Sequence, residues 1–184
     1  DSDGYFDPNI PPTNRVLRVP VHYKEANPDY PANRIVGQPY AEHPEFRFTG
    51  PSDLAVDRRD AIADGVARNL YLSDEEILFV IEPGEPGGSG VVKKLVEIPG
   101  RRWSGLAVDS SGNLLFADWR AGEVFLLTAS EIDAIRTGGS PIESDGALDQ
   151  RAYLIKEGLA GPTDIELDNN EARYVVSTEE GFQP

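Results

Sequence analysis

Cysteine and methionine are both absent from the 184 residues of this chain. Without cysteine the protein forms no disulfide and carries no thiol chemistry, so cysteine spacing says nothing about its compartment. The absence of both oxidisable sulfur side chains suits an oxidising environment. The first residues, Asp1-Ser2-Asp3, suit the start of a secreted chain from which a signal peptide has been removed. We therefore expect an extracellular or periplasmic protein.

Basic residues and long apolar runs are scarce as well. The chain has 17 Lys and Arg against 32 Asp and Glu, which gives a net charge of −15. Proteins that bind nucleic acids neutralise phosphates with Lys and Arg, and no basic cluster here is larger than a pair such as Lys93-Lys94 or Arg101-Arg102. No apolar run reaches the roughly 18 residues that a membrane-spanning helix needs. We expect neither nucleic-acid binding nor membrane insertion.

One pattern occurs three times along the chain. It reads GPSDLAVD at 50–57, RWSGLAVD at 102–109 and GPTDIELD at 161–168. Each copy alternates apolar and polar residues, as a strand with one buried face does, and ends on Asp. A second short strand follows each copy, at 69–74, 113–118 and 172–177. Self-similarity of this kind is typical of a repeat architecture.

The first two repeats each contain four predicted strands. In the middle repeat a turn at 109–113 joins the first two strands, and further strands are expected at 123–128 and 151–155. In the first repeat they are expected near 54–57, 70–73, 77–81 and 94–98. Repeated units of four antiparallel strands indicate an all-β fold of β-propeller blades. A β-sandwich is the alternative.

Insertions are expected at 58–65 and 129–150, the second with a helix at 130–136 that starts at a Ser cap.

The strand count leaves the third repeat incomplete. We divide the chain into a Pro-rich arm (1–45) with one strand at 15–21, and blades at 46–99, 100–157 and 158–184. The third blade has only two predicted strands, whereas strands at 15–21 and 45–49 belong to no blade. The chain thus holds about three four-stranded blades, and another copy or further sequence would complete the ring. A fragment of a longer six-bladed protein is the alternative interpretation.

Unpaired strand edges favour pairing with another chain. We therefore expect strands of one copy to complete a blade of the next, which makes a closed homo-oligomer or an open filament. The expected interface residues are Val16, Leu17, Val19, Val21, Tyr174 and Val176.

Residues 105–118, GLAVDSSGNLLFAD, resemble a repeat of the NHL family and of the related gluconolactonase-like and strictosidine-synthase-like propellers. The resemblance covers about 46–181 and implies a six-bladed propeller. Gluconolactonase-like relatives bind a divalent metal at the propeller axis, and the matching positions here are Ser52, Ser104 and Thr163. Hydroxyls are weak ligands beside carboxylates, so the resemblance implies neither that metal centre nor the family's hydrolase activity.

The amino terminus offers a second candidate for metal binding. Asp1, Asp3 and Asp7 resemble the start of an acidic calcium loop, although Ca²⁺ takes six to eight oxygen ligands. A similar acidic loop is expected at 143–149, and Ca²⁺ is the only cofactor suggested. No catalytic constellation is recognisable. The sequence therefore predicts a secreted, non-catalytic propeller module that acts as a structural or interaction subunit. The alternatives are part of a lactonase-like metal-dependent hydrolase and a propeller that binds sugar or peptide.

Overall fold

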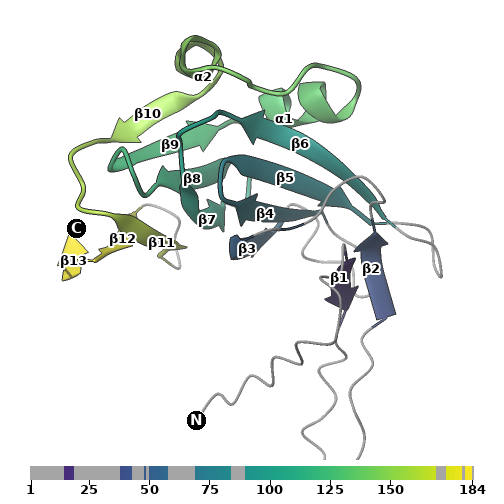
Figure 1. The fold of residues 1–184 in the computed structure, drawn as a ribbon, viewed down its shortest axis with the longest axis horizontal. Helices are drawn as coiled ribbons and strands as arrows, with labels where there is room; N and C mark the ends of the chain where they lie inside the picture. The colour runs from purple at the N-terminus through teal and green to yellow at the C-terminus, as the bar shows by residue number, and fades with distance from the viewer. Residues whose placement is uncertain are drawn as a thin grey trace, which may run out of the picture.

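The chain folds into antiparallel β-sheets with two short helices, as a computed structural model shows (Figure 1). The structure describes residues 15–18, 38–42, 48, 50–57, 69–83, 90–168, 173–179 and 181–183. Two sheets have four strands, one has three and one has two. The predicted all-β class is therefore confirmed.

The first repeat forms a four-stranded meander. Its strands follow one another in space as in sequence: β3 (Pro51–Val56), β4 (Leu70–Asp74), β5 (Ile77–Glu82) and β6 (Val91–Glu97). All four were predicted, with slightly different ends. The turn between β4 and β5 places Glu75 at a positive φ of 51°. The predicted insertion at 58–65 lies outside the described residues.

The second repeat forms the same meander. Its strands are β7 (Trp103–Val108), β8 (Leu114–Asp118), β9 (Glu123–Leu127) and β10 (Tyr153–Lys156). The predicted turn joins β7 to β8. There Gly112 has a φ of 82°, which glycine adopts without steric cost, and the Asp109 side chain accepts a hydrogen bond from Asn113 N at 2.8 Å.

The third repeat forms a sheet of three strands. They are β11 (Pro162–Leu167), β12 (Tyr174–Thr178) and β13 (Gly181–Gln183), in that order. The prediction of only two strands is wrong, because β13 pairs with β12. Its three residues are too few to show the alternation by which strands are recognised. This sheet is one strand shorter than the other two.

Two helices fill the connection between β9 and β10. Helix α1 (Ala129–Arg136) matches the predicted helix, but its cap is Thr128, whose hydroxyl accepts a hydrogen bond from Glu131 N. The acidic loop expected at 143–149 is instead largely helix α2 (Asp145–Arg151), capped by Ser144. A Ser cap with an acidic first turn is a standard start for a helix, so these acids do not form a calcium loop.

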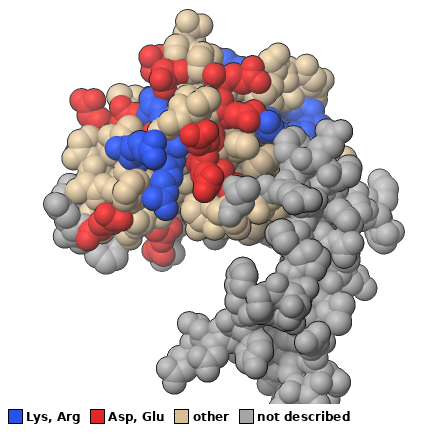
Figure 2. Space-filling model, in the orientation of Figure 1, with Lys and Arg blue, Asp and Glu red and all other residues tan. Residues whose placement is uncertain are grey.

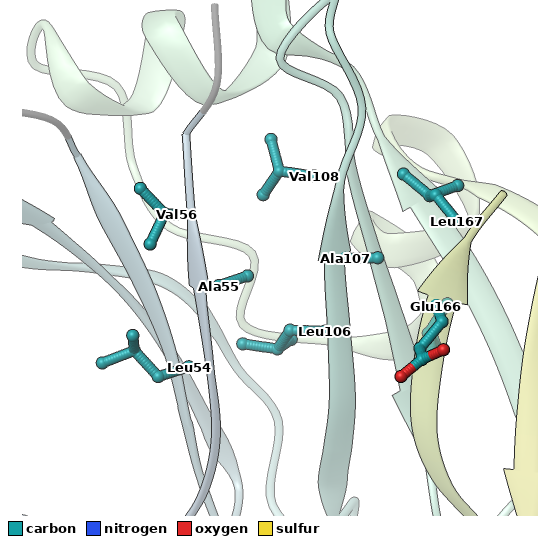
Figure 3. Close-up of a pocket in the computed structure, with 9 residues that line it drawn as sticks. Leu54, Ala55, Val56, Leu106, Ala107, Val108, Glu166 and Leu167 are labelled. Carbon is teal, nitrogen blue, oxygen red and sulfur yellow. The ribbon is translucent and has the colours of Figure 1, made fainter. Parts of the chain in front are cut away.

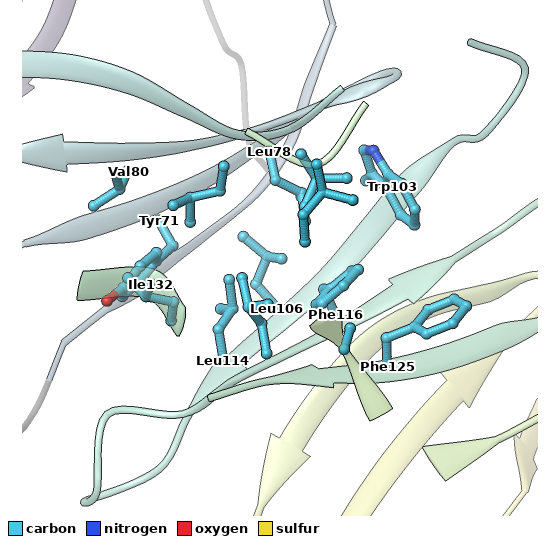
Figure 4. Close-up of a cluster of buried hydrophobic side chains, with 14 of the residues drawn as sticks. Tyr71, Leu78, Val80, Trp103, Leu106, Leu114, Phe116, Phe125 and Ile132 are labelled. Carbon is cyan, nitrogen blue, oxygen red and sulfur yellow. The ribbon is translucent and has the colours of Figure 1, made fainter. Parts of the chain in front are cut away.

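We call the sheets of the three repeats the first, second and third sheets. The principal core lies between the first and second sheets (Figure 4). Trp103 is fully buried and meets Phe116 edge to face, with ring centroids 5.3 Å apart. Helix α1 adds Ile132 to this cluster. A second cluster joins the second and third sheets; it includes Leu115, Ala117, Val124, Ile165 and Val176. The second sheet is thus apolar on both faces, as expected of a sheet between two neighbours.

The amino-terminal region supplies a separate pair of strands. β1 (Arg15–Arg18) pairs with β2 (Gln38–Glu42) of the same chain, so the strand predicted at 15–21 has a partner that was not foreseen. Of the strand predicted at 45–49, only Phe48 is described; it lies outside any strand and meets Phe79 edge to face at 5.5 Å. Within the described ranges, no helix is long and apolar enough to cross a membrane.

Candidate interaction site

The first strands of the three sheets, β3, β7 and β11, form a row. They line a pocket of about 350 Å³ that opens between them (Figure 3). Equivalent positions of the three repeats face it: Leu54, Leu106 and Ile165; Ala55, Ala107 and Glu166; Val56, Val108 and Leu167. Glu166 is the one charged residue of this lining. An apolar hollow with a single carboxylate offers few of the convergent polar groups that ligand sites use for orientation.

Two of the three hydroxyls at the positions that the resemblance matched to metal ligands join neighbouring sheets. Ser52 Oγ donates to the carbonyl of Trp103 at 3.0 Å, across the junction of the first and second sheets. Ser104 Oγ donates to the carbonyl of Pro162 at 2.6 Å, across the next junction. In both bonds the third residue of one copy of the repeated pattern donates to the carbonyl of the second residue of the next copy. The hydroxyl of Thr163 has no following sheet within the described residues and donates to Ser177 O of its own sheet at 3.2 Å.

A carboxylate reinforces the first junction. Asp53 Oδ2 accepts a hydrogen bond from Leu106 N at 2.6 Å, and its Oδ1 accepts one from Leu54 N at 2.7 Å. The same repeat position in the second sheet is Gly105, where a Cβ would lie 2.4 Å from Asp164 Cα. The absence of a side chain there lets β11 approach closely. Side chains at this position therefore point toward the following sheet.

Tryptophans occupy the edges of both junctions. Trp103 Nε1 donates to Glu76 O, in the first sheet, at 2.8 Å. Trp119 Nε1 donates to Glu179 Oε1, beside the third sheet, at 2.9 Å. The guanidinium of Arg102 lies 4.7 Å above the Trp119 ring, a favourable cation–π arrangement. Both tryptophans thus join sheets.

Arg101 carries the densest group of charges. Its guanidinium pairs with Asp118, Glu123 and Asp145, which lie on β8, β9 and α2. Burial alone would lower the pKa of Arg101, but hydrogen bonds to these three carboxylates outweigh it and raise the pKa. The group is thus a permanently charged structural link. Elsewhere, Figure 2 shows basic side chains lying between acidic ones on the face in view, with no large patch of one sign.

The other predicted site residues do not come together. Asp1, Asp3, Asp7, Val19 and Val21 lie outside the described residues, and Val16 and Leu17 belong to β1. Val176 is 3% exposed and packs with Tyr174 toward the second sheet of the same chain. Burial raises the pKa of Tyr174. Across the described ranges, no group of three or more acidic or histidine side chains is placed to hold a metal ion.

The residues on the outer face of the third sheet were missed. Glu166 and Val175 pair across β11 and β12 and are exposed. Because neighbouring strand residues face opposite sides, they point away from Ile165 and Val176. That alternation was visible in the sequence, but which face meets the second sheet was not.

No protein-family model and no curated protein matches this chain.

Proposed function

We propose that this chain is a secreted, non-catalytic β-propeller module that acts as a structural or interaction subunit by joining other copies of itself. The single observation that carries the proposal is the repeated junction between sheets. Two junctions inside the chain use the same hydroxyl-to-carbonyl bond. The third sheet bears the same hydroxyl with no following sheet among the described residues.

Several features support blades of a propeller. The sheets are meanders of successive strands, and their first strands lie beside one another around a shared hollow (Figure 3). In a propeller the first strand of every blade lines the central channel in this way. Within the described residues, the row of three sheets has two open sides, and two copies would supply six sheets.

The third sheet also leaves room for a strand. Among the described residues it has three strands, with β13 at its edge, whereas the first two sheets have four. Pairing of a strand from another copy with β13 would complete it and satisfy the outer backbone groups of that strand. Strand addition of this kind gives affinity through main-chain hydrogen bonds.

A hydrolase of the lactonase type has less support. The Ser52 and Ser104 hydroxyls already donate to carbonyls of the neighbouring sheet. Ser104 is also 7% exposed and therefore closed off from a substrate.

Native mass tests the proposal. Sedimentation velocity and light scattering of the full chain, over a dilution series, should show masses that rise above the 20.1 kDa monomer as concentration increases. Hydrogen exchange should show β13 amides becoming protected over the same range, with the central strand β8 as the internal control. A chain that remains monomeric at its highest soluble concentration would contradict the proposal.

A further inference from the structure

We propose that the open side of the third sheet docks the first sheet of a second copy, with Thr163 and Asp164 of one copy holding strand β3 of the other. This docking surface rests on the self-assembly proposed above and specifies which faces of the two copies meet. We infer its geometry from the junction that Ser52 and Asp53 make with β7 inside a single chain.

Two side-chain hydrogen bonds hold the internal junction together. The Ser52 hydroxyl donates to the carbonyl of Trp103, and the Asp53 carboxylate accepts from the N–H of Leu106. A donor and an acceptor on adjacent residues of β3 thus bind a carbonyl and an N–H that lie three residues apart on β7, the first strand of the next sheet. In a second copy, the equivalent groups of β3 are the carbonyl of Pro51 and the N–H of Leu54. Leu54 N donates to Asp53 Oδ1 of its own chain, so the carboxylate of Asp164 would share this N–H with Asp53 or replace it.

The third sheet carries the same donor and acceptor residues, although the Thr163 hydroxyl donates to Ser177 O of its own sheet and would turn to the carbonyl of the second copy on docking. Thr163 and Asp164 stand at the repeat positions of Ser52 and Asp53. Asp164 Oδ1 accepts from Ile165 N at 2.8 Å, just as Asp53 Oδ1 accepts from Leu54 N at 2.7 Å. The carboxylate of Asp164 is therefore held in the arrangement in which the Asp53 carboxylate binds the next strand.

Apolar exposure occurs where a neighbouring sheet is missing. On β3, Leu54 is 44% and Val56 38% exposed, whereas the equivalent Leu106 and Val108 of β7 are each 5% exposed beneath the first sheet. The two strands have the same repeat position and nearly the same sequence. The difference in burial therefore reflects that no sheet of the described residues precedes β3 in the row.

The opposite open side shows the same effect. Val175 on β12 is 40% exposed, and its equivalents Tyr71 and Leu115 are 0% and 4% exposed because a sheet follows each of them. Docking of β3 from a second copy would cover both kinds of exposed residue at once.

A second copy fits because its first sheet is open in the right place. Along the row of described first strands, β3 is the one that exposes the side on which a preceding sheet would pack. On β5, farther from the row, the same face of the first sheet is covered: Phe79 is 1% exposed and Phe48 packs on it. The contact is therefore confined to the inner strands, close to the row.

Glu166 distinguishes this junction from the internal ones. It stands where the internal junctions have Ala55 and Ala107, and its carboxylate is exposed at the pocket (Figure 3). Bringing a second acidic chain against this carboxylate costs free energy that the internal junctions avoid. Association between copies should therefore be weaker than the joining of sheets within a chain, and Glu166→Ala should strengthen it.

Sedimentation equilibrium of the full chain and four single variants tests the surface. All are measured at physiological ionic strength, because two copies of charge −15 repel each other at low salt. Asp164→Ala should weaken association about tenfold, as expected for loss of a hydrogen bond to a charged group. Thr163→Val, which keeps the shape, should weaken it about threefold. Glu166→Ala should tighten it. The matched control is Asp149→Ala, which removes the same charge from the exposed side of α2 and should match the wild type.

The outcomes separate the two proposals. Amides of β3 and β11 should also gain hydrogen-exchange protection as the wild type associates, and circular dichroism should show every variant folded. If the chain associates but Asp164→Ala matches Asp149→Ala, the docking surface is wrong while self-assembly stands. If the wild type and Glu166→Ala both remain monomeric at every concentration, self-assembly and the docking surface both fall.

Discussion

Replacing Gly105 with alanine tests the close packing of the second and third sheets. The added Cβ would lie 2.4 Å from Asp164 Cα, 2.5 Å from its carbonyl carbon and 2.7 Å from Ile165 N. All three are backbone atoms, so no side chain can turn aside, and β11 must move outward. Overpacking of this kind costs about 1–3 kcal/mol, against which alanine recovers about 0.5–1 kcal/mol through its smaller entropy loss in a strand. The net expectation is a loss of about 1–2 kcal/mol.

Urea unfolding followed by tryptophan fluorescence measures this loss, because Trp103 is fully buried. The control is Gly146→Ala in helix α2, where no atom lies within 4 Å of the added Cβ. That change should stabilise the chain by up to about 1 kcal/mol, since alanine has the higher helix propensity. The two substitutions therefore have opposite predicted signs. A Gly105→Ala variant as stable as the wild type would refute the proposed contact between β7 and β11.

Two further predictions concern the polar links. Ser104→Ala leaves the buried carbonyl of Pro162 without its donor, which is 2.6 Å away, and should lower the free energy of unfolding by about 1–3 kcal/mol in the same urea assay; a change near zero would contradict a role for this hydroxyl in joining sheets. Glu82→Gln tests pH dependence: burial alone would raise the pKa of Glu82, but hydrogen bonds and charge attraction from Lys93 and Arg136 outweigh it and lower the pKa. A lowered pKa means that the carboxylate stabilises the fold fully above its unfolded pKa of 4.5 and loses this contribution as the pH falls through the folded value. The difference between wild type and variant should therefore be about 0.5–1 kcal/mol at pH 7 and vanish in acid; a difference independent of pH would contradict it.

Strands with a period-two pattern were predictable one by one. β7 and β8 were expected almost as they occur, because their residues alternate on either side of a Gly-Asn turn. β13 escaped notice because three residues carry no period. Helix α2 escaped because its acidic first turn resembles a metal loop, and the buried Leu148 alone marks its inner side.

The hydroxyls of the candidate site were noticed in the sequence, but their part in joining the sheets was not predicted. The resemblance drew attention to Ser52, Ser104 and Thr163 as metal-ligand positions. The hydrogen bonds that Ser52 and Ser104 make between sheets, however, depend on residues about 50 to 60 positions later in the chain. Such long-range partners are set by how the sheets pack, which no local pattern describes.

The sequence by itself determined the repeat and the all-β class, because burial and strand period act within a few residues. Only the tertiary structure decided which face of each strand meets which sheet. It also decided that Gly105 must lack a side chain and that Leu54, Val56 and Val175 remain exposed. These properties depend on whether a neighbouring sheet is present. The same residue pattern is therefore buried in the second repeat and open at the two ends of the row.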